Sequence, residues 1–168
     1  LLGPSRFFGT RLSKAVVAEG CFIHADAIEE SVVGIRSRIG SGSTVKRTVM
    51  MGNDYFEPLE QVINPTATPM GVGEDCIIEN AILDKDCRIG DNVIIRGHKD
   101  LADEKAEGYT IKDGIVIVHK GALISNGSRI GAWDLEEEKE EEEEEVVNAK
   151  AEAEAVVVVD KKSKKDKK

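Results

Sequence analysis

Small aliphatic residues recur through the first 130 residues of the chain at intervals of six positions, and several are directly followed by glycine. A period of six fits neither the 3.6-residue repeat of an α-helix nor a long two-residue alternation. It is typical of a parallel β-helix, in which three short units make one turn of a triangular prism and each aliphatic residue points inward. The clearest runs are Val33, Ile39, Val45 and Met51; Leu83, Ile89 and Ile95; and Val118, Ile124 and Ile130.

The repeat is imperfect, because offsets of five residues join Val72 to Ile77 and Ile78 to Leu83. The remaining composition still agrees with a narrow prism, since only 4% of the residues are aromatic and branched aliphatic residues suit a pleated, stacked surface. We expect the glycines to adopt corner dihedrals that a Cβ would oppose. Neither the strict alternation of a β-sandwich nor the amphipathic helices of an α/β fold is clear. The pattern itself does not give the hand of the coil.

Two stretches interrupt the repeat. Residues 53–70 contain three of the four prolines and are predicted to form an excursion from the coil. Residues 97–110 are polar and are predicted to form a loop that brings charges near Lys112 and Lys120. Loops of this length in a compact array are usually functional or disordered.

The charge of the chain is concentrated at its C-terminal end. Residues 134–168 contain 14 acidic and 8 basic residues, so they supply most of the formal net charge of −9. This segment is low in complexity, acidic and then basic, and is predicted to be a disordered tail. We therefore divide the chain into a β-helix domain at 1–133 and a tail at 134–168.

Charge and hydropathy also exclude several classes of partner. Residues 1–133 are nearly balanced in charge, which disfavours a broad nucleic-acid-binding surface. No apolar run approaches the roughly 20 residues of a membrane-spanning helix, so no membrane partner is expected. Cys21, Cys76 and Cys87 are widely spaced and are interpreted as buried small side chains rather than a disulfide or redox set. The first residues contain neither a Met start nor a signal peptide, so we expect the chain to be a fragment.

Three longer strings carry a specific resemblance to a known family. They are EGCFIHADAIEESVVGIRSRIGSGSTVKRTVMMGNDYF, VGEDCIIENAILDKDCRIGDNVIIRGHKD and EGYTIKDGIVIVHKGALI, in that order. Over residues 1–131 the chain resembles the C-terminal domain of ADP-glucose pyrophosphorylase (glucose-1-phosphate adenylyltransferase) of the plant, algal and cyanobacterial type. The most specific motifs are MMGNDYF, LDKDCRIG and EGYTIKDGI.

The resemblance implies a fold, partners and a location. The fold is an all-β, left-handed parallel β-helix that joins subunits of a homo- or hetero-oligomer, a tetramer in the family, and helps to form its effector sites. The N-terminal catalytic domain is absent from this sequence, so the chain alone is not expected to be active. Accordingly, no cofactor is expected here, because Mg²⁺ belongs to the missing domain. The location implied is the plastid for a plant or algal protein and the cytoplasm otherwise.

The same resemblance implies which residues bind anionic effectors such as 3-phosphoglycerate and inorganic phosphate. Lys85 in DKDCRIG and Lys120 in GIVIVHKGAL occupy the positions of effector lysines, and lysine is suited to binding such anions. Lys99 in GHKD matches with one extra residue, and Arg88 shares the motif of Lys85. Arg36 and Arg38 in VGIRSRIG are candidates for an interface or a further anion contact.

Other functional classes remain open at this stage. One is a non-catalytic scaffold or pseudo-subunit that assembles through solenoid edges. Another is a hexapeptide-repeat acyltransferase, for which His98 is the available catalytic histidine. A zinc site built from His24, His98 and His119 is disfavoured, because the three histidines lie in different repeats, and no metal site is predicted.

Overall fold

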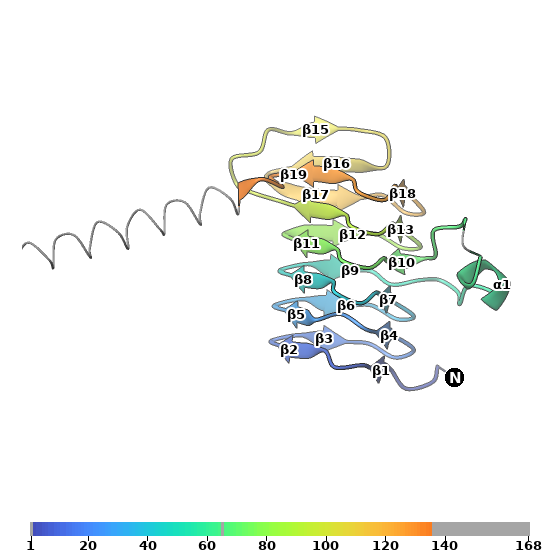
Figure 1. The fold of residues 1–168 in the computed structure, drawn as a ribbon. Coiled ribbons are helices and arrows are strands. Elements are labelled where there is room, and N and C mark those ends of the chain that lie inside the picture. Colours follow the sequence, from blue (N-terminus) through green and yellow to red (C-terminus); the bar gives the residue numbers. More distant parts are fainter. Residues whose placement is uncertain (1, 65, 136–168) are drawn as a thin grey trace, which may run out of the picture. The chain divides into compact units, whose positions relative to one another are not determined.

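The computed structural model describes residues 2–64 and 66–135. The chain divides into two units, Leu1–Trp133 and Asp134–Lys168. The predicted disordered tail lies almost wholly outside the described residues. Within the first unit short strands stack into columns (Figure 1), as a parallel β-helix requires.

Three sheets form the faces of this prism. The first face contains β1 (Arg6–Phe7), β4 (Phe22–Ile23), β7 (Arg38–Ile39), β10 (Gly71–Val72), β13 (Arg88–Ile89) and β18 (Leu123–Ile124). The second contains β2 (Arg11–Ser13), β5 (Ala27–Glu29), β8 (Thr44–Lys46), β11 (Ile77–Glu79), β14 (Ile94–Arg96) and β19 (Arg129–Gly131). The third contains β3 (Val16–Val17), β6 (Val32–Val33), β9 (Val49–Met50), β12 (Ala81–Leu83), β17 (Ile115–Val118), β16 (Tyr109–Lys112) and β15 (Glu104–Lys105).

The inward aliphatic residues stack in register along each face. On the second face Val45 pairs with Ile78, and Ile78 pairs with Ile95, 17 residues further along the chain. All three are at most 1% exposed, so they form a continuous apolar column. Hydrophobic burial in such columns stabilises the prism, while the parallel strand pairs satisfy the backbone polar groups. The predicted β-helix is therefore confirmed.

One residue, Met51, was wrongly predicted to point inward. Met51 is 47% exposed, whereas Met50 is 5% exposed and points into the core. The reason is a regular offset of five at the corner between the second and third faces, which recurs from Val45 to Met50 and from Ile78 to Leu83. A coil of 17 residues thus has two steps of six and one of five, so the imperfection of the repeat is systematic.

The glycines that follow inward residues act mainly through space rather than through backbone dihedrals. Gly40 and Gly73 do not have positive φ values. A Cβ at Gly40 would lie 2.4 Å from the Gly73 carbonyl oxygen, and one at Gly73 would lie 2.5 Å from that of Gly90. The predicted dihedral requirement is wrong for these positions, because the close approach of consecutive coils excludes a side chain. It holds for Gly52, whose φ is 85°.

Both predicted interruptions leave the coil, and the second has more structure than expected. Residues 53–70 project from the column and contain the short helix α1 (Leu59–Val62), which lies beside the first face (Figure 1). Residues 97–110 were predicted to be a loop, but β15 and β16 lie within or begin in this stretch. β15 pairs antiparallel with β16, and β16 pairs antiparallel with β17, so the two strands extend the third face. The pairing of β16 with the edge of β17, and of β15 with β16, explains why a polar sequence becomes strand.

The three cysteines are buried and free. The pKa of the Cys87 thiol is raised to about 12, chiefly by burial and further by Asp84 and Asp86. A thiol with such a pKa is almost entirely protonated at neutral pH, and the thiolate is the reactive form. Cys21, Cys76 and Cys87 therefore act as small core side chains, as predicted.

Candidate functional site

Three consecutive coils place charged residues at one corner of the prism, between the third and first faces. Met50, Leu83 and Val118 stack in register at the ends of β9, β12 and β17. Lys85 and Lys120 each lie two residues beyond their strand end, and the N–H of Gly121 donates to the carbonyl oxygen of Lys85 over 2.8 Å. Equivalent positions in successive coils thus bring these two lysines together, although they are 35 residues apart in sequence.

The carboxylate of Asp54 joins the two lysines. Its Oδ1 lies 2.6 Å from the Nζ of Lys85, and its Oδ2 lies 2.6 Å from the Nζ of Lys120. The Asp54 side chain is 39% exposed, and those of Lys85 and Lys120 are 43% and 56% exposed. These three side chains form the lysine corner, a site open to solvent.

The charges of the lysine corner perturb one another. Hydrogen bonds from Lys120 and then Lys85 lower the pKa of Asp54 from 3.8 to about 2. The hydrogen bond with Asp54 raises the pKa of Lys120. Asp86 adds a second carboxylate, with its Oδ2 3.7 Å from the Nζ of Lys120. At neutral pH the corner therefore holds two ammonium groups on the ionised carboxylate of Asp54, with Asp86 close to Lys120.

The excursion at 53–70 is anchored on both sides of Asp54. The N–H of Asp54 donates to the Oδ1 of Asp86 over 2.8 Å, and the N–H of Asn53 donates to the carbonyl oxygen of Ile35 over 2.9 Å. Beyond Asp54, the carboxylate of Glu57 forms an ion pair with the guanidinium of Arg88 and accepts a hydrogen bond from the N–H of Met70. The backbone around the site is held independently of the two lysines.

Arg88, the effector candidate that shares the motif of Lys85, lies against the excursion. It lies on β13, where it contacts Glu57 and donates to the carbonyl oxygen of Thr68 over 2.7 Å. The side chain of Glu57 is only 6% exposed, so this ion pair is largely shielded from water. The geometry brings Arg88 to the base of the excursion and not to Asp54.

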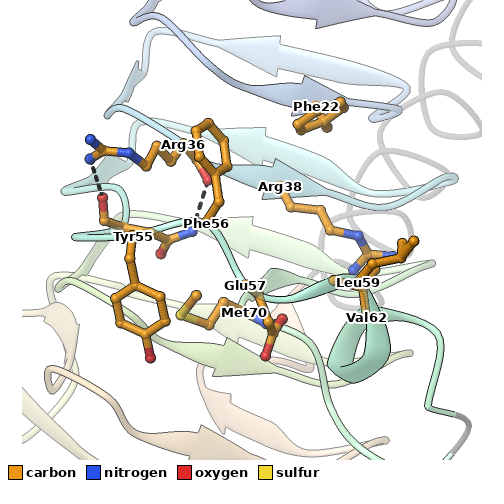
Figure 2. A pocket seen from close by; sticks show the side chains of 10 residues that line it. Phe22, Arg36, Arg38, Tyr55, Phe56, Glu57, Leu59, Val62 and Met70 are labelled. Atoms are coloured by element: carbon orange, nitrogen blue, oxygen red, sulfur yellow. Dashed lines mark hydrogen bonds between the residues drawn. The ribbon is translucent and has the colours of Figure 1, made fainter. Parts of the chain in front are cut away.

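Arg36 and Arg38 line a pocket of about 370 Å³ between the first face and the excursion. Figure 2 shows Arg36 beside Phe56, with Arg38 directed toward Leu59 and Val62 of α1. Arg36 donates to the carbonyl oxygen of Asn53 over 3.1 Å, and its guanidinium lies 5.6 Å from the centroid of the Phe56 ring. The two arginines are therefore part of an apolar pocket, separate from the three residues of the lysine corner.

Lys99 and the histidines are spread over other parts of the molecule. Lys99 follows His98, whose Nδ1 lies 3.5 Å from a carboxylate oxygen of Asp100. The Nε2 of His119 lies 2.8 Å from the Oγ1 of Thr110, and His24 stacks on Phe8. Within residues 2–64 and 66–135, no group of three or more His, Cys, Asp or Glu side chains is placed to hold a metal ion. The geometry does not bring Lys99 into contact with Asp54.

Two of the site's acidic residues escaped the sequence analysis. Asp54 lies in the motif MMGNDYF, which served only as a mark of the family resemblance. Glu57 lies three residues after Asp54, and no role was predicted for it from the sequence. A signal for the lysines existed in the repeat, because Lys85 and Lys120 both follow an inward aliphatic residue by two positions. No comparable signal marked Asp54, since it lies where the coil gives way to the excursion.

Comparisons with known proteins agree with this architecture. A family model described as the GLGC left-handed parallel beta-helix domain matches residues 1–128. The large subunit 1 of glucose-1-phosphate adenylyltransferase, chloroplastic/amyloplastic, from Zea mays is 38% identical over 134 residues. The alignment covers 77% of this chain and 26% of the maize protein, so the chain spans a minor part of that relative's length. No helix in the described part of the chain is long and apolar enough to cross a membrane.

The family match covers most of the chain and gives the hand of the coil. It also confirms the resemblance to ADP-glucose pyrophosphorylase that the motifs indicated. With its three parallel faces and stacked aliphatic columns, the chain belongs to the GLGC left-handed parallel β-helix family, the C-terminal β-helix domain of glucose-1-phosphate adenylyltransferases.

Proposed function

We propose that this chain is the regulatory and oligomerisation domain of a plastid ADP-glucose pyrophosphorylase. The enzyme as a whole would convert glucose 1-phosphate and ATP to ADP-glucose and pyrophosphate for starch synthesis. The family match supports this proposal, as does a relative whose name describes a large subunit of a chloroplast or amyloplast enzyme. In this proposal the present chain supplies contacts and control, while the catalytic residues and Mg²⁺ belong to another part of the enzyme.

The observation that carries the proposal is the convergence of Lys85 and Lys120 on one carboxylate. Each ammonium lies 2.6 Å from a different oxygen of Asp54. An anion that reached this corner could present one oxygen to each lysine in the same way. Phosphate and phosphorylated acids such as 3-phosphoglycerate have the oxygens and the charge for such bridging contacts. We therefore assign the lysine corner to effector binding.

Regulation follows if the anion bridges this corner to basic groups elsewhere in the enzyme. An effector that binds one domain arrangement more tightly shifts the population toward it. The free energy available for the shift is the difference between the binding free energies of the effector in the two domain arrangements. The shift is therefore largest when both lysines contact the anion in one arrangement and not in the other.

The end of the prism supports the oligomerisation part of the proposal. The outer edges of β1, β2 and β3 have no paired strand among the residues that the structure describes. Phe7, Leu12 and Val16 on these strands are 42%, 46% and 64% exposed. Unpaired strand edges with apolar side chains favour association with another chain. Light scattering of the full chain should give the mass of an oligomer, and a Leu12→Lys variant should shift it toward the monomer.

Effector binding is tested by titrating the full chain with 3-phosphoglycerate in an isothermal titration calorimeter. The Lys85→Met, Lys120→Met double variant should bind at least about tenfold more weakly, because charge-assisted hydrogen bonds are lost. Lys112→Met is the matched control, since Lys112 is a similarly exposed lysine paired with Asp103. Equal affinity of the wild-type chain and the double variant would refute effector binding at this corner.

A further inference from the structure

The proposed anion site already contains an anion of its own. Asp54 occupies the position between the two ammonium groups, with one carboxylate oxygen on each. Hydrogen bonds from both lysines hold the pKa of Asp54 near 2, so its carboxylate is ionised at neutral pH. An incoming anion must therefore replace the carboxylate or share the lysines with it.

Replacement requires only a movement of the Asp54 side chain. The backbone of the segment stays anchored, because the N–H of Asp54 bonds to Asp86 and Asn53 bonds to both Ile35 and Arg36. The Asp54 side chain is 39% exposed, and its carboxylate forms hydrogen bonds with the exposed ammonium groups of Lys85 and Lys120. Rotation about the side-chain bonds would release both lysines without opening the core or the excursion.

The surrounding charges set a requirement on the ligand. Asp86 and Asp84 also act on Lys120, so the corner holds more negative charge than Asp54 alone supplies. A singly charged carboxylic acid would exchange one carboxylate for another and gain little. A doubly charged phosphate group offers an oxygen to each lysine and more negative charge than Asp54, so it can displace the side chain.

We propose that Asp54 is an internal competitor that lowers the affinity of the lysine corner for anions. This inference rests on the proposed anion binding at Lys85 and Lys120 and adds the residue that limits its affinity. Asp54 holds the lysines in place in the absence of ligand and weakens the binding of every anion. Displacing Asp54 costs the same free energy for every anion, so the affinities for phosphate and for acetate fall by the same factor.

The test compares the affinities of the full chain for inorganic phosphate and for acetate at pH 8. Asp54→Asn removes the charge while keeping the shape of the side chain, and Asp54→Ala removes the side chain beyond Cβ. Both variants should bind phosphate about three- to tenfold more tightly, as expected when one exposed ion-paired carboxylate no longer competes. Their affinity for acetate should rise by a similar factor. Circular dichroism of each variant checks that the β-helix is intact.

Asp103→Asn is the matched control, because Asp103 is an exposed aspartate paired with Lys112 and its pKa is also lowered. It should bind phosphate with the affinity of the wild-type chain. Unchanged or weaker phosphate binding in both Asp54 variants would overturn the inference. If, in that case, the Lys85→Met, Lys120→Met variant still lost phosphate binding, the proposed effector site would stand and only the competition by Asp54 would be refuted. Absence of phosphate binding in the wild-type chain and in every Asp54 variant would instead overturn the effector site itself.

Discussion

Replacing Ile78 by alanine tests the inward column on which the fold depends. Ile78 is completely buried on β11, between Val45 and Ile95 of the neighbouring coils. The substitution removes three carbon groups, each contributing about 0.8 kcal/mol on transfer from water. The neighbours are fixed by parallel strand pairing and cannot close the space, so a cavity cost is added. We expect the free energy of unfolding to fall by about 3 to 4 kcal/mol.

Ile77→Ala is the matched control on the same strand. Ile77 is only partly buried, because successive residues of a strand point to opposite sides of the sheet. Its replacement should cost about 1 kcal/mol, from partial loss of contact with Thr44 and Ile94 in the adjacent coils.

Urea unfolding followed by far-UV circular dichroism measures both variants, with the free energy obtained by linear extrapolation. The two substitutions delete the same atoms from adjacent positions, so composition and local propensity cancel in the comparison. Equal losses for Ile77→Ala and Ile78→Ala would refute the assignment of Ile78 to the interior of the prism.

Two further predictions concern the corners of the coil. Gly73→Ala should lower the free energy of unfolding by about 2 to 3 kcal/mol in the same urea assay, because its Cβ would lie 2.5 Å from the Gly90 carbonyl oxygen. Gly3→Ala should be nearly neutral, since nothing lies within 4 Å of its added Cβ, and equal effects would contradict the close-approach argument. The charged groups around Asp54 are Lys85, Lys120, Asp84 and Asp86. The pKa of Asp54 is lower in the folded chain than its ordinary value of 3.8. The ionised carboxylate therefore stabilises the fold above about pH 4, and this stabilisation is lost as the pH falls toward 2. Carboxyl-detected NMR should give a midpoint near pH 2 for Asp54, and a midpoint that did not rise in the Lys85→Met, Lys120→Met variant would exclude the lysines as its cause.

Much of the fold follows from local pattern. Inward positions such as Ile39, Ile95 and Val118 were correctly predicted, because each needs only an aliphatic side chain at a regular interval. Met51 was assigned wrongly, since two adjacent methionines satisfy the same local rule and the five-residue corner decides between them. The role of glycine was misjudged at Gly40 and Gly73, where the crowding comes from the next coil rather than from the residue's own dihedrals.

The candidate site shows the same division. The motifs placed Lys85 and Lys120 among the candidates together with Arg88, Lys99, Arg36 and Arg38. Only the fold shows that Lys85 and Lys120 share Asp54, whereas Arg88 pairs with Glu57. Nothing in a linear motif distinguishes these partners, because each lies in a coil or excursion far along the chain.

The sequence by itself determined the coil, since short-range spacing of aliphatic residues and the exclusion of bulky ones are enough to select a prism with an apolar interior. Only the tertiary structure decided the chemistry at its surface. Asp54 meets Lys85 across 31 residues and Lys120 across 66, and these contacts depend on the length of each coil and on the paths of both excursions. The physical reason is that burial acts residue by residue along the chain, whereas charge recognition requires side chains from several coils to meet at one corner.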